Sequence, residues 1–236
     1  VVVAYLSGDA RMIDVIETGK RPHAVTGSTM TGCPEEIVLK EDKLLGKITD
    51  PDRLKEEREK HLPELIDIEK SLKFLPRSMT IYQCGKKSNH GLNYREGAPM
   101  FALINEIPER EAKLIVESYS SHVYPGIQLW WNSIDEQLRK DRTFTNCFGR
   151  KVRLLDEWGK ELKNKATSFV PQSTVSDCVI EAIRKAYQDR SPVFQKMDLL
   201  TETYDSATIQ YPTDDFKSMA EFAIKFGLDY LCPQME

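Results

Sequence analysis

The sequence predicts an α+β fold that is mainly helical and carries a few short antiparallel strands. Several segments repeat apolar residues at helical spacing between clear start and stop signals, as at Trp130, Ile134 and Leu138. Two shorter segments, 143–155 and 199–212, alternate apolar and polar residues between turn signals, which is typical of hairpins. The sequence contains no internal repeat that would indicate a solenoid or propeller.

Elements near the start of the chain can be assigned from local signals. Residues 1–6 open with three valines and predict the end of a strand, and Asp9 predicts the cap of a helix that ends at Gly19. Residues 35–70 hold 12 acidic and 8 basic residues, which is typical of a solvated helical surface and indicates an insertion.

Prolines and glycines mark the bounds of the later helices, because proline cannot continue a helix and Tyr124-Pro125-Gly126 is a sharp break. We expect these helices over 78–94, 108–122, 126–140 and 171–189.

Composition restricts the class of protein. With 40% hydrophobic and 30% charged residues, the 236-residue chain is typical of a globular protein, and no apolar run approaches the ~20 residues that cross a bilayer. We therefore expect no membrane partner. The five cysteines form no CxxC pair, which favours buried thiols over a zinc site. Their use also predicts a reducing, cytoplasmic location. A start at Val1 without methionine indicates a fragment.

Charge is distributed unevenly along the chain. The net charge is −4, but residues 71–95 carry five bases and no acid, and residues 139–165 carry nine bases against four acids. Residues 198–236 carry two bases against eight acids. An acidic protein with this distribution can still present a basic channel to phosphate groups.

The most informative segment is GKKSNHGLNY, residues 85–94. On a helix, Lys86, His90 and Tyr94 follow each other at intervals of four and share one face. An ammonium, an imidazole and a phenol suit the phosphates and base of a nucleoside triphosphate. The two glycines leave room for a close neighbour. Taken alone, the pattern fits a solvated helix face somewhat better than a nucleotide site.

This segment resembles the fingers helix of family A (DNA polymerase I–like) DNA polymerases, in which Arg, Lys, an aromatic residue and Tyr are each four residues apart. Lys86 and Tyr94 match the pattern, His90 replaces the aromatic residue, and Tyr82 stands where the arginine is expected. The resemblance implies that Lys86 contacts the triphosphate and assists the leaving group, that His90 stacks on the incoming nucleotide, and that Tyr94 packs at the nascent base pair.

Two further segments resemble the same family. Residues 1–27 are similar to the stretch that follows the family's first catalytic motif, and His23 matches the histidine near the triphosphate, although Arg21 replaces the usual Asp. By itself, His23 fits a surface histidine. Residues 117–131 are similar to the family's helix pair broken at Tyr-Pro.

Segments TNCFGRKVR and ATSFVPQSTVSD resemble the family's basic hairpin and the palm helix that follows it. The resemblance implies that the hairpin bases face the nucleic-acid backbone, although a solvated hairpin fits them as well. It also implies that Gln172 contacts the minor-groove side of the primer–template, with Ser173 replacing the family's glycine. The implied DNA-binding residues are Arg150, Lys151, Arg153, Gln172, Thr174 and Tyr204.

Segment LLTETYDSATIQYP resembles the family's third motif, a hairpin bearing His-Asp-Glu. Asp205 matches the acid, Tyr204 replaces His, and Ser206 replaces Glu. The resemblance implies that Asp205 is catalytic and binds Mg²⁺ in a two-metal site. The second Asp is expected upstream of Val1, so we expect this piece to be inactive unless another polymerase segment supplies it.

The sequence therefore predicts fingers and part of a palm. Residues 1–20 are assigned to a palm strand end and helix, 21–165 to fingers with a charged insertion at 35–75, and 166–236 to a C-terminally truncated palm. The implied function is transfer of a nucleotidyl group from a dNTP to a primer 3′-hydroxyl on a primer–template. The departures from the motifs resemble phage or environmental viral polymerases, and the resemblance implies the cytoplasm of a bacterial cell or a phage-infected host. Two alternatives remain: a non-catalytic nucleic-acid-binding or assembly subunit, and an unrelated helical interaction module.

Overall fold

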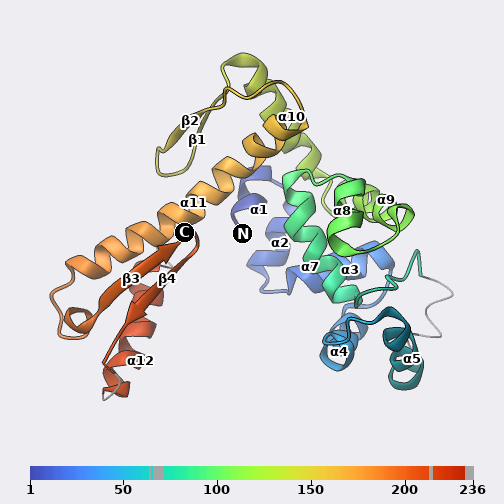
Figure 1. Ribbon diagram of the computed structural model, residues 1–236, viewed down its shortest axis with the longest axis horizontal. Helices are drawn as coiled ribbons and strands as arrows, with labels where there is room; N and C mark the ends of the chain where they lie inside the picture. The colour runs from blue at the N-terminus through green and yellow to red at the C-terminus, as the bar shows by residue number, and fades with distance from the viewer. Residues whose placement is uncertain (64, 66–71, 213–214, 232–236) are drawn as a thin grey trace. The chain divides into compact units, whose positions relative to one another are not determined.

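The computed structural model in Figure 1 describes residues 1–63, 65, 72–212 and 215–231. The chain forms two compact units, Val1–Arg142 with Leu154–Thr167, and Thr143–Arg153 with Ser168–Glu236. Helices dominate, and the described strands pair into two separate antiparallel hairpins. This arrangement confirms the predicted α+β class.

The first unit is helical. Its elements are α1 (Val2–Ser7), α2 (Ala10–Glu17), α3 (Pro22–Thr31), α4 (Glu35–Leu45), α5 (Pro51–His61), α7 (Ile81–Gly91), the 3-10 turn η1 (Leu92–Tyr94), α8 (Ala98–Asn105), α9 (Glu109–Ser118), the π-turn η2 (Tyr119–Val123) and α10 (Gly126–Lys140).

The predicted strand at residues 1–6 is wrong, because this segment is helix α1. Val3 and Ala4 are buried in the core, and Gly8 ends the helix with a positive φ of 62°. Packing of these two residues outweighs the strand preference of the valines.

The predicted cap at Asp9 is confirmed. Its carboxylate accepts a hydrogen bond from the amide of Met12 at 2.9 Å, which caps helix α2. The second carboxylate oxygen accepts the amide of Gly126 at 2.7 Å, and so fixes the chain break before α10.

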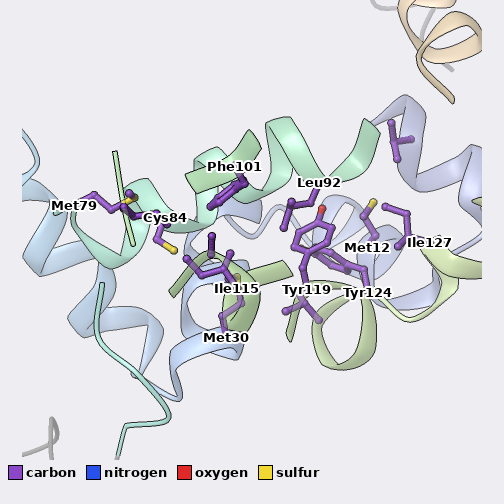
Figure 2. Packing of buried hydrophobic residues seen from close by; sticks show 14 of the residues in the cluster. Met12, Met30, Met79, Cys84, Leu92, Phe101, Ile115, Tyr119, Tyr124 and Ile127 are labelled. Atoms are coloured by element: carbon purple, nitrogen blue, oxygen red, sulfur yellow. The ribbon is translucent and has the colours of Figure 1, made fainter. Parts of the chain in front are cut away.

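The unit's largest apolar cluster lies between these helices (Figure 2). Tyr119 and Tyr124 are buried in it with their rings edge to face, and the ring centroids are 5.4 Å apart. The neighbouring side chains labelled in Figure 2 include Met12, Met30, Cys84, Leu92, Phe101, Ile115 and Ile127.

The charged segment at 35–70 forms helices α4 and α5 where it is described; residues 64 and 66–70 lie outside the described part. Its surface is not wholly solvated, because Arg58 and Glu41 form a buried ion pair. Arg58 also donates to the carbonyl oxygens of Pro76 (2.6 Å) and Met79 (2.8 Å). These bonds offset the cost of burying both charges.

Glu41 fixes the start of helix α7. Its second carboxylate oxygen accepts the amide of Ile81 at 2.8 Å, an N–H that has no partner within the helix. Thr80 caps the same turn by accepting from the amide of Gln83. Burial raises the pKa of the Glu41 carboxyl, against the opposing effect of Arg58.

Helices α3 and α7 cross at backbone contact (Figure 1). A Cβ at Gly85 would overlap the carbonyl oxygen of His23 and lie 2.8 Å from the amide nitrogen of Gly27. A Cβ at Gly27 would lie 2.6 Å from the carbonyl oxygen of Ile81. Both glycines are therefore required at the crossing, as the sequence predicted for Gly85.

The second unit contains the hairpins. Its elements are β1 (Thr143–Thr145), β2 (Lys151–Arg153), the C-terminal part of α11 (Lys160–Gln188), η3 (Phe194–Lys196), β3 (Asp198–Thr203), β4 (Ser206–Gln210), α12 (Phe216–Lys225) and η4 (Phe226–Leu231).

Both predicted hairpins are confirmed. Helix α11 begins at Lys160 rather than at Pro171, which lies inside the helix. An aromatic cluster around Phe194 and Phe222, with ring centroids 5.2 Å apart, forms the core beside the second hairpin.

Gly85→Ala should lower the free energy of unfolding by about 1–3 kcal/mol, because the added methyl group overlaps backbone atoms that cannot move aside independently. Urea denaturation followed by circular dichroism measures the change. Gly159→Ala is the matched control, since a Cβ there meets no atom within 4 Å. If the two variants are equally stable, glycine is not required at position 85.

Candidate nucleotide-binding site and nucleic-acid interface

Three of the predicted nucleotide-binding residues lie together at the α3–α7 crossing. His23 is in the first turn of α3, and its ring centroid is 5.8 Å from that of His90 on α7. Lys86, one turn before His90, is exposed and close enough to influence the charge of His23. The rings of Tyr82 and His23 lie edge to face, with their centroids 5.7 Å apart. Tyr82 stands where the family pattern has an arginine.

Asn89 orients the His23 ring. Its amide nitrogen lies 3.1 Å from His23 Nδ1, while its amide oxygen accepts hydroxyl bonds from Thr26 and Tyr119, each at 3.1 Å. Since the amide nitrogen can only donate, Nδ1 is the acceptor, and the neutral ring carries its proton on Nε2. Sequence reasoning missed Asn89, although its place one residue before His90 puts it on the side of α7 that faces α3.

A buried hydroxyl network supports this amide. Tyr119 and Tyr124 come from the turn before α10, and the Tyr124 hydroxyl lies 2.9 Å from that of Thr26. Burial raises the pKa of Tyr119 well above its ordinary value of 10.0, so the hydroxyl remains a donor at neutral pH. The predicted break at Tyr124-Pro125 thus supplies groups that hold Asn89.

The electrostatic environment of His23 favours its neutral form. Partial burial lowers its pKa below the ordinary value of 6.5, and the nearby His90 and Lys86 lower it further. A site with this excess of positive charge attracts an anion, and a bound anion would raise the pKa of His23 again.

Tyr94 is placed differently from Lys86 and His90. Helix α7 ends at Gly91, and Tyr94 belongs to a 3-10 turn, whose tighter winding departs from the α-helical register. The side chain is half-buried and packs against the apolar cluster of the first unit. Its contact with a base pair stays a prediction.

In the second unit, the basic hairpin is fixed to helix α11. Arg150 donates to both carboxylate oxygens of Asp177, with Nε 3.0 Å from Oδ2. Asn146 donates to the same carboxylate at 2.6 Å, and its own oxygen accepts the Arg150 amide at 2.9 Å. The pKa of Asp177 is lowered, mainly by Arg150. Lys151 and Arg153 remain exposed on β2.

The other predicted DNA-binding residues lie on α11 and the second hairpin. The Tyr204 hydroxyl donates to the side-chain oxygen of Gln172 at 2.9 Å. Tyr204 has a positive φ of 59° in a two-residue turn, a conformation that glycine adopts at lower cost. Thr174 is buried, so its side chain is not presented to solvent. Sequence reasoning named Gln172 and Tyr204 separately but did not predict their contact.

Asp205 occupies the exposed tip of the β3–β4 hairpin. Within the described ranges, no three His, Cys, Asp or Glu side chains gather as metal ligands. Mg²⁺ is usually held by one or two carboxylates together with substrate phosphates and water. Asp205 therefore fits one position in such a ligand set and does not form a site by itself.

Comparison with known proteins shows which proteins this chain resembles in sequence and in fold. No protein-family model matches the sequence. The thermostable DNA polymerase I of Thermus aquaticus is 22% identical over 226 residues, which cover 94% of this chain and 22% of that polymerase. The solved POL domain of Pol1 from M. smegmatis, in complex with DNA primer-template and dNTP, aligns with a TM-score of 0.66 and 18% identity.

The chain has the fold of part of a DNA polymerase I polymerase domain. The structural match covers 95% of this chain and 34% of the Pol1 chain. Together, the two comparisons confirm the resemblance to DNA polymerase I that the motifs predicted. Because the chain spans only about a fifth of the Thermus polymerase, the comparison does not extend to the activity of a complete enzyme. None of the helices in the described part could span a membrane.

Lys86→Met should raise the pKa of His23, because it removes one of the positive charges that disfavour the protonated ring. Proton NMR of the histidine rings across a pH titration measures the shift. Lys87→Met, one residue further along α7, is the control and should leave the pKa of His23 unchanged. An unchanged His23 titration in Lys86→Met would show that the two groups do not interact.

The depressed pKa also fixes the sign of the stability change with pH. Below pH 6.5 the unfolded chain protonates this histidine before the folded chain does, so His23 reduces stability as the pH falls towards its folded pKa. His23→Gln should remove this part of the acid destabilisation.

Proposed function

We propose that this chain forms the fingers and part of the palm of a template-directed DNA polymerase. The observation that carries the proposal is the grouping of His23, Lys86 and His90 at the α3–α7 crossing, in a fold shared with a polymerase domain. The solved relative holds primer-template DNA and a dNTP, and the same ligands are proposed for this chain.

The α3–α7 cluster would bind the incoming dNTP. The Lys86 ammonium is exposed and can pair with the triphosphate, and the Nε2 proton of neutral His23 can be donated to a phosphate oxygen. The exposed ring of His90 offers a surface on which the sugar or base can stack. Tyr94, at the end of the same segment, would pack at the nascent base pair.

The second unit would hold DNA through its hairpins and α11. Asp177 and Asn146 fix Arg150, which then presents its exposed edge with Lys151 to the phosphate backbone. Arg153 would extend this basic surface.

Between α11 and the other hairpin, the Gln172–Tyr204 pair would face the minor-groove side, where a neutral amide can contact base edges of any sequence. The buried Thr174 would support the helix that carries Gln172.

The proposed reaction is attack of the primer 3′-hydroxyl oxygen on the α-phosphorus. A bond forms between that oxygen and phosphorus, the bond to the pyrophosphate oxygen breaks, and the hydroxyl proton is released to water. Mg²⁺, when bound, supplies stabilisation of the negative charge that develops on these oxygens. Asp205 would be one of its ligands, and Lys86 would neutralise the departing pyrophosphate. A second carboxylate would come from another polymerase segment, which is the partner that the sequence predicts.

A non-catalytic nucleic-acid-binding subunit is the second candidate. Tyr204 and Ser206 flank Asp205 where the motif has other residues, and no group of three potential metal-binding side chains occurs in the described ranges. This candidate predicts binding of primer–template without extension.

Lys86→Ala should weaken dNTP binding by about 10- to 100-fold, from the ~1.5–3 kcal/mol of a charge-assisted hydrogen bond. Primer–template affinity should change by less than about 2-fold, because the ammonium contacts the triphosphate rather than the duplex. Fluorescence anisotropy with labelled dNTP and labelled duplex measures both constants. Lys87→Ala, the neighbouring residue on α7, is the control. The dNTP role of Lys86 is excluded if both lysine variants bind dNTP like the unmodified chain.

Asp205→Asn should reduce primer extension by at least about 100-fold when the chain is combined with an N-terminal polymerase segment, because a neutral amide is a poor Mg²⁺ ligand. A gel-based extension assay with Mg²⁺ measures the rate. Asp198→Asn, an exposed acid on the same hairpin, is the control. Duplex binding without extension in every variant would favour the non-catalytic candidate.

A further inference from the structure

An exposed tryptophan lies beside two cations in the first unit, and none of the three residues has been assigned a role above. Trp158 precedes helix α11 and keeps 48% of its surface exposed. The Arg139 guanidinium carbon and the Lys163 ammonium nitrogen each lie 5.8 Å from its ring centroid. The three residues come from the end of α10, the connecting segment and the start of α11.

The exposure of Trp158 is not explained by packing. The other two tryptophans, Trp130 and Trp131, are half-buried and pack against the apolar cluster of the unit. Trp158 instead lies in a segment where the neighbouring Leu155 is also 78% exposed. An exposed aromatic ring beside cations can contact both the flat ring and the negative charge of a ligand.

The charges near the ring favour an anionic ligand. Lys163 shares Asp135 with Arg95, whereas Arg139 has no ion-pair partner among the residues that the structure describes. Acidic groups are also present: Asp156 is paired with Lys165, and Glu157 is exposed beside the tryptophan. Arg139 therefore carries a guanidinium that forms no ion pair within the described residues, beside an indole ring that is exposed to solvent.

We propose that Trp158, with Arg139 and Lys163, binds single-stranded nucleic acid by stacking an unpaired base and pairing with its phosphate. A tryptophan ring stacks on any base, and adjacent cations track the backbone, which gives sequence-independent binding. Bases within a duplex are already stacked, so the site selects unpaired nucleotides. The proposal rests on the nucleic-acid-binding function proposed above and assigns it a second contact, for the unpaired strand.

Trp158→Ala should weaken binding of a labelled oligothymidylate by about 5- to 100-fold, the range measured for loss of one base–aromatic stack. Affinity for a blunt duplex of the same length should change by less than about 2-fold. Arg139→Gln should reduce the slope of log affinity against log salt by about 0.7, the value for one phosphate contact on a single strand. Arg110→Gln, an exposed arginine on α9, is the matched control and should leave the slope unchanged.

Intrinsic fluorescence tests the same contact without a disruptive substitution. Oligothymidylate should quench the emission of the unmodified chain in a saturable way, and Trp158→Phe should lose this quenching while retaining most of the affinity. The proposal is overturned if Trp158→Phe is quenched as strongly as the unmodified chain. It is also overturned if Trp158→Ala loses as much affinity for the duplex as for the single strand. If the unmodified chain binds neither single strand nor primer–template, the proposed polymerase function fails as well. If it binds only primer–template, the single-strand site at Trp158 alone is excluded.

Discussion

The direct backbone contact between α3 and α7 is the constraint on which the candidate nucleotide site depends. Gly27 and Gly85 carry no side chain at the contact, so the helices approach closely enough for the rings of His23 and His90 to meet. A wider crossing would separate the imidazoles and remove the bond between Asn89 and His23. The positive character of the cluster is therefore a product of helix packing rather than of one helix face.

Both ends of α7 are held by buried or partly buried charges. At its start, Glu41 binds the first amide and is paired with Arg58. After the 3-10 turn that follows the helix, Arg95 donates to Asp135 and to the Trp131 carbonyl oxygen. Such pairs contribute little net stability but hold a defined geometry, since the loss of one partner leaves a buried charge. This geometry keeps Lys86 and His90 in register with α3.

The second unit uses hydrogen bonds from turns to position its polar groups. Asn146 organises the turn of the first hairpin and shares Asp177 with Arg150. Tyr204 connects the tip of the other hairpin to Gln172. In each hairpin, the group proposed to meet DNA is held by a neighbour on α11, so the helix orders both hairpins.

The sequence alone determined the helical character, both hairpins, the Asp9 cap and the resemblance to DNA polymerase I. These follow from local signals: periodicity, turn residues and the spacing of motif residues. It misplaced the ends of α7 and α11 and predicted a strand for residues 1–6, because tertiary packing outweighs propensity at such sites.

Only the tertiary structure decided the partners of the polar groups. The Asn89–His23 bond joins residues 66 positions apart, and the Arg58–Glu41 pair is buried within a segment whose composition is typical of a solvated surface. Such contacts depend on which faces meet when helices pack, and a pattern within one helix holds no information on the helix opposite. For the same reason, the sequence did not predict that Arg139 of α10 and Lys163 of α11 lie beside Trp158.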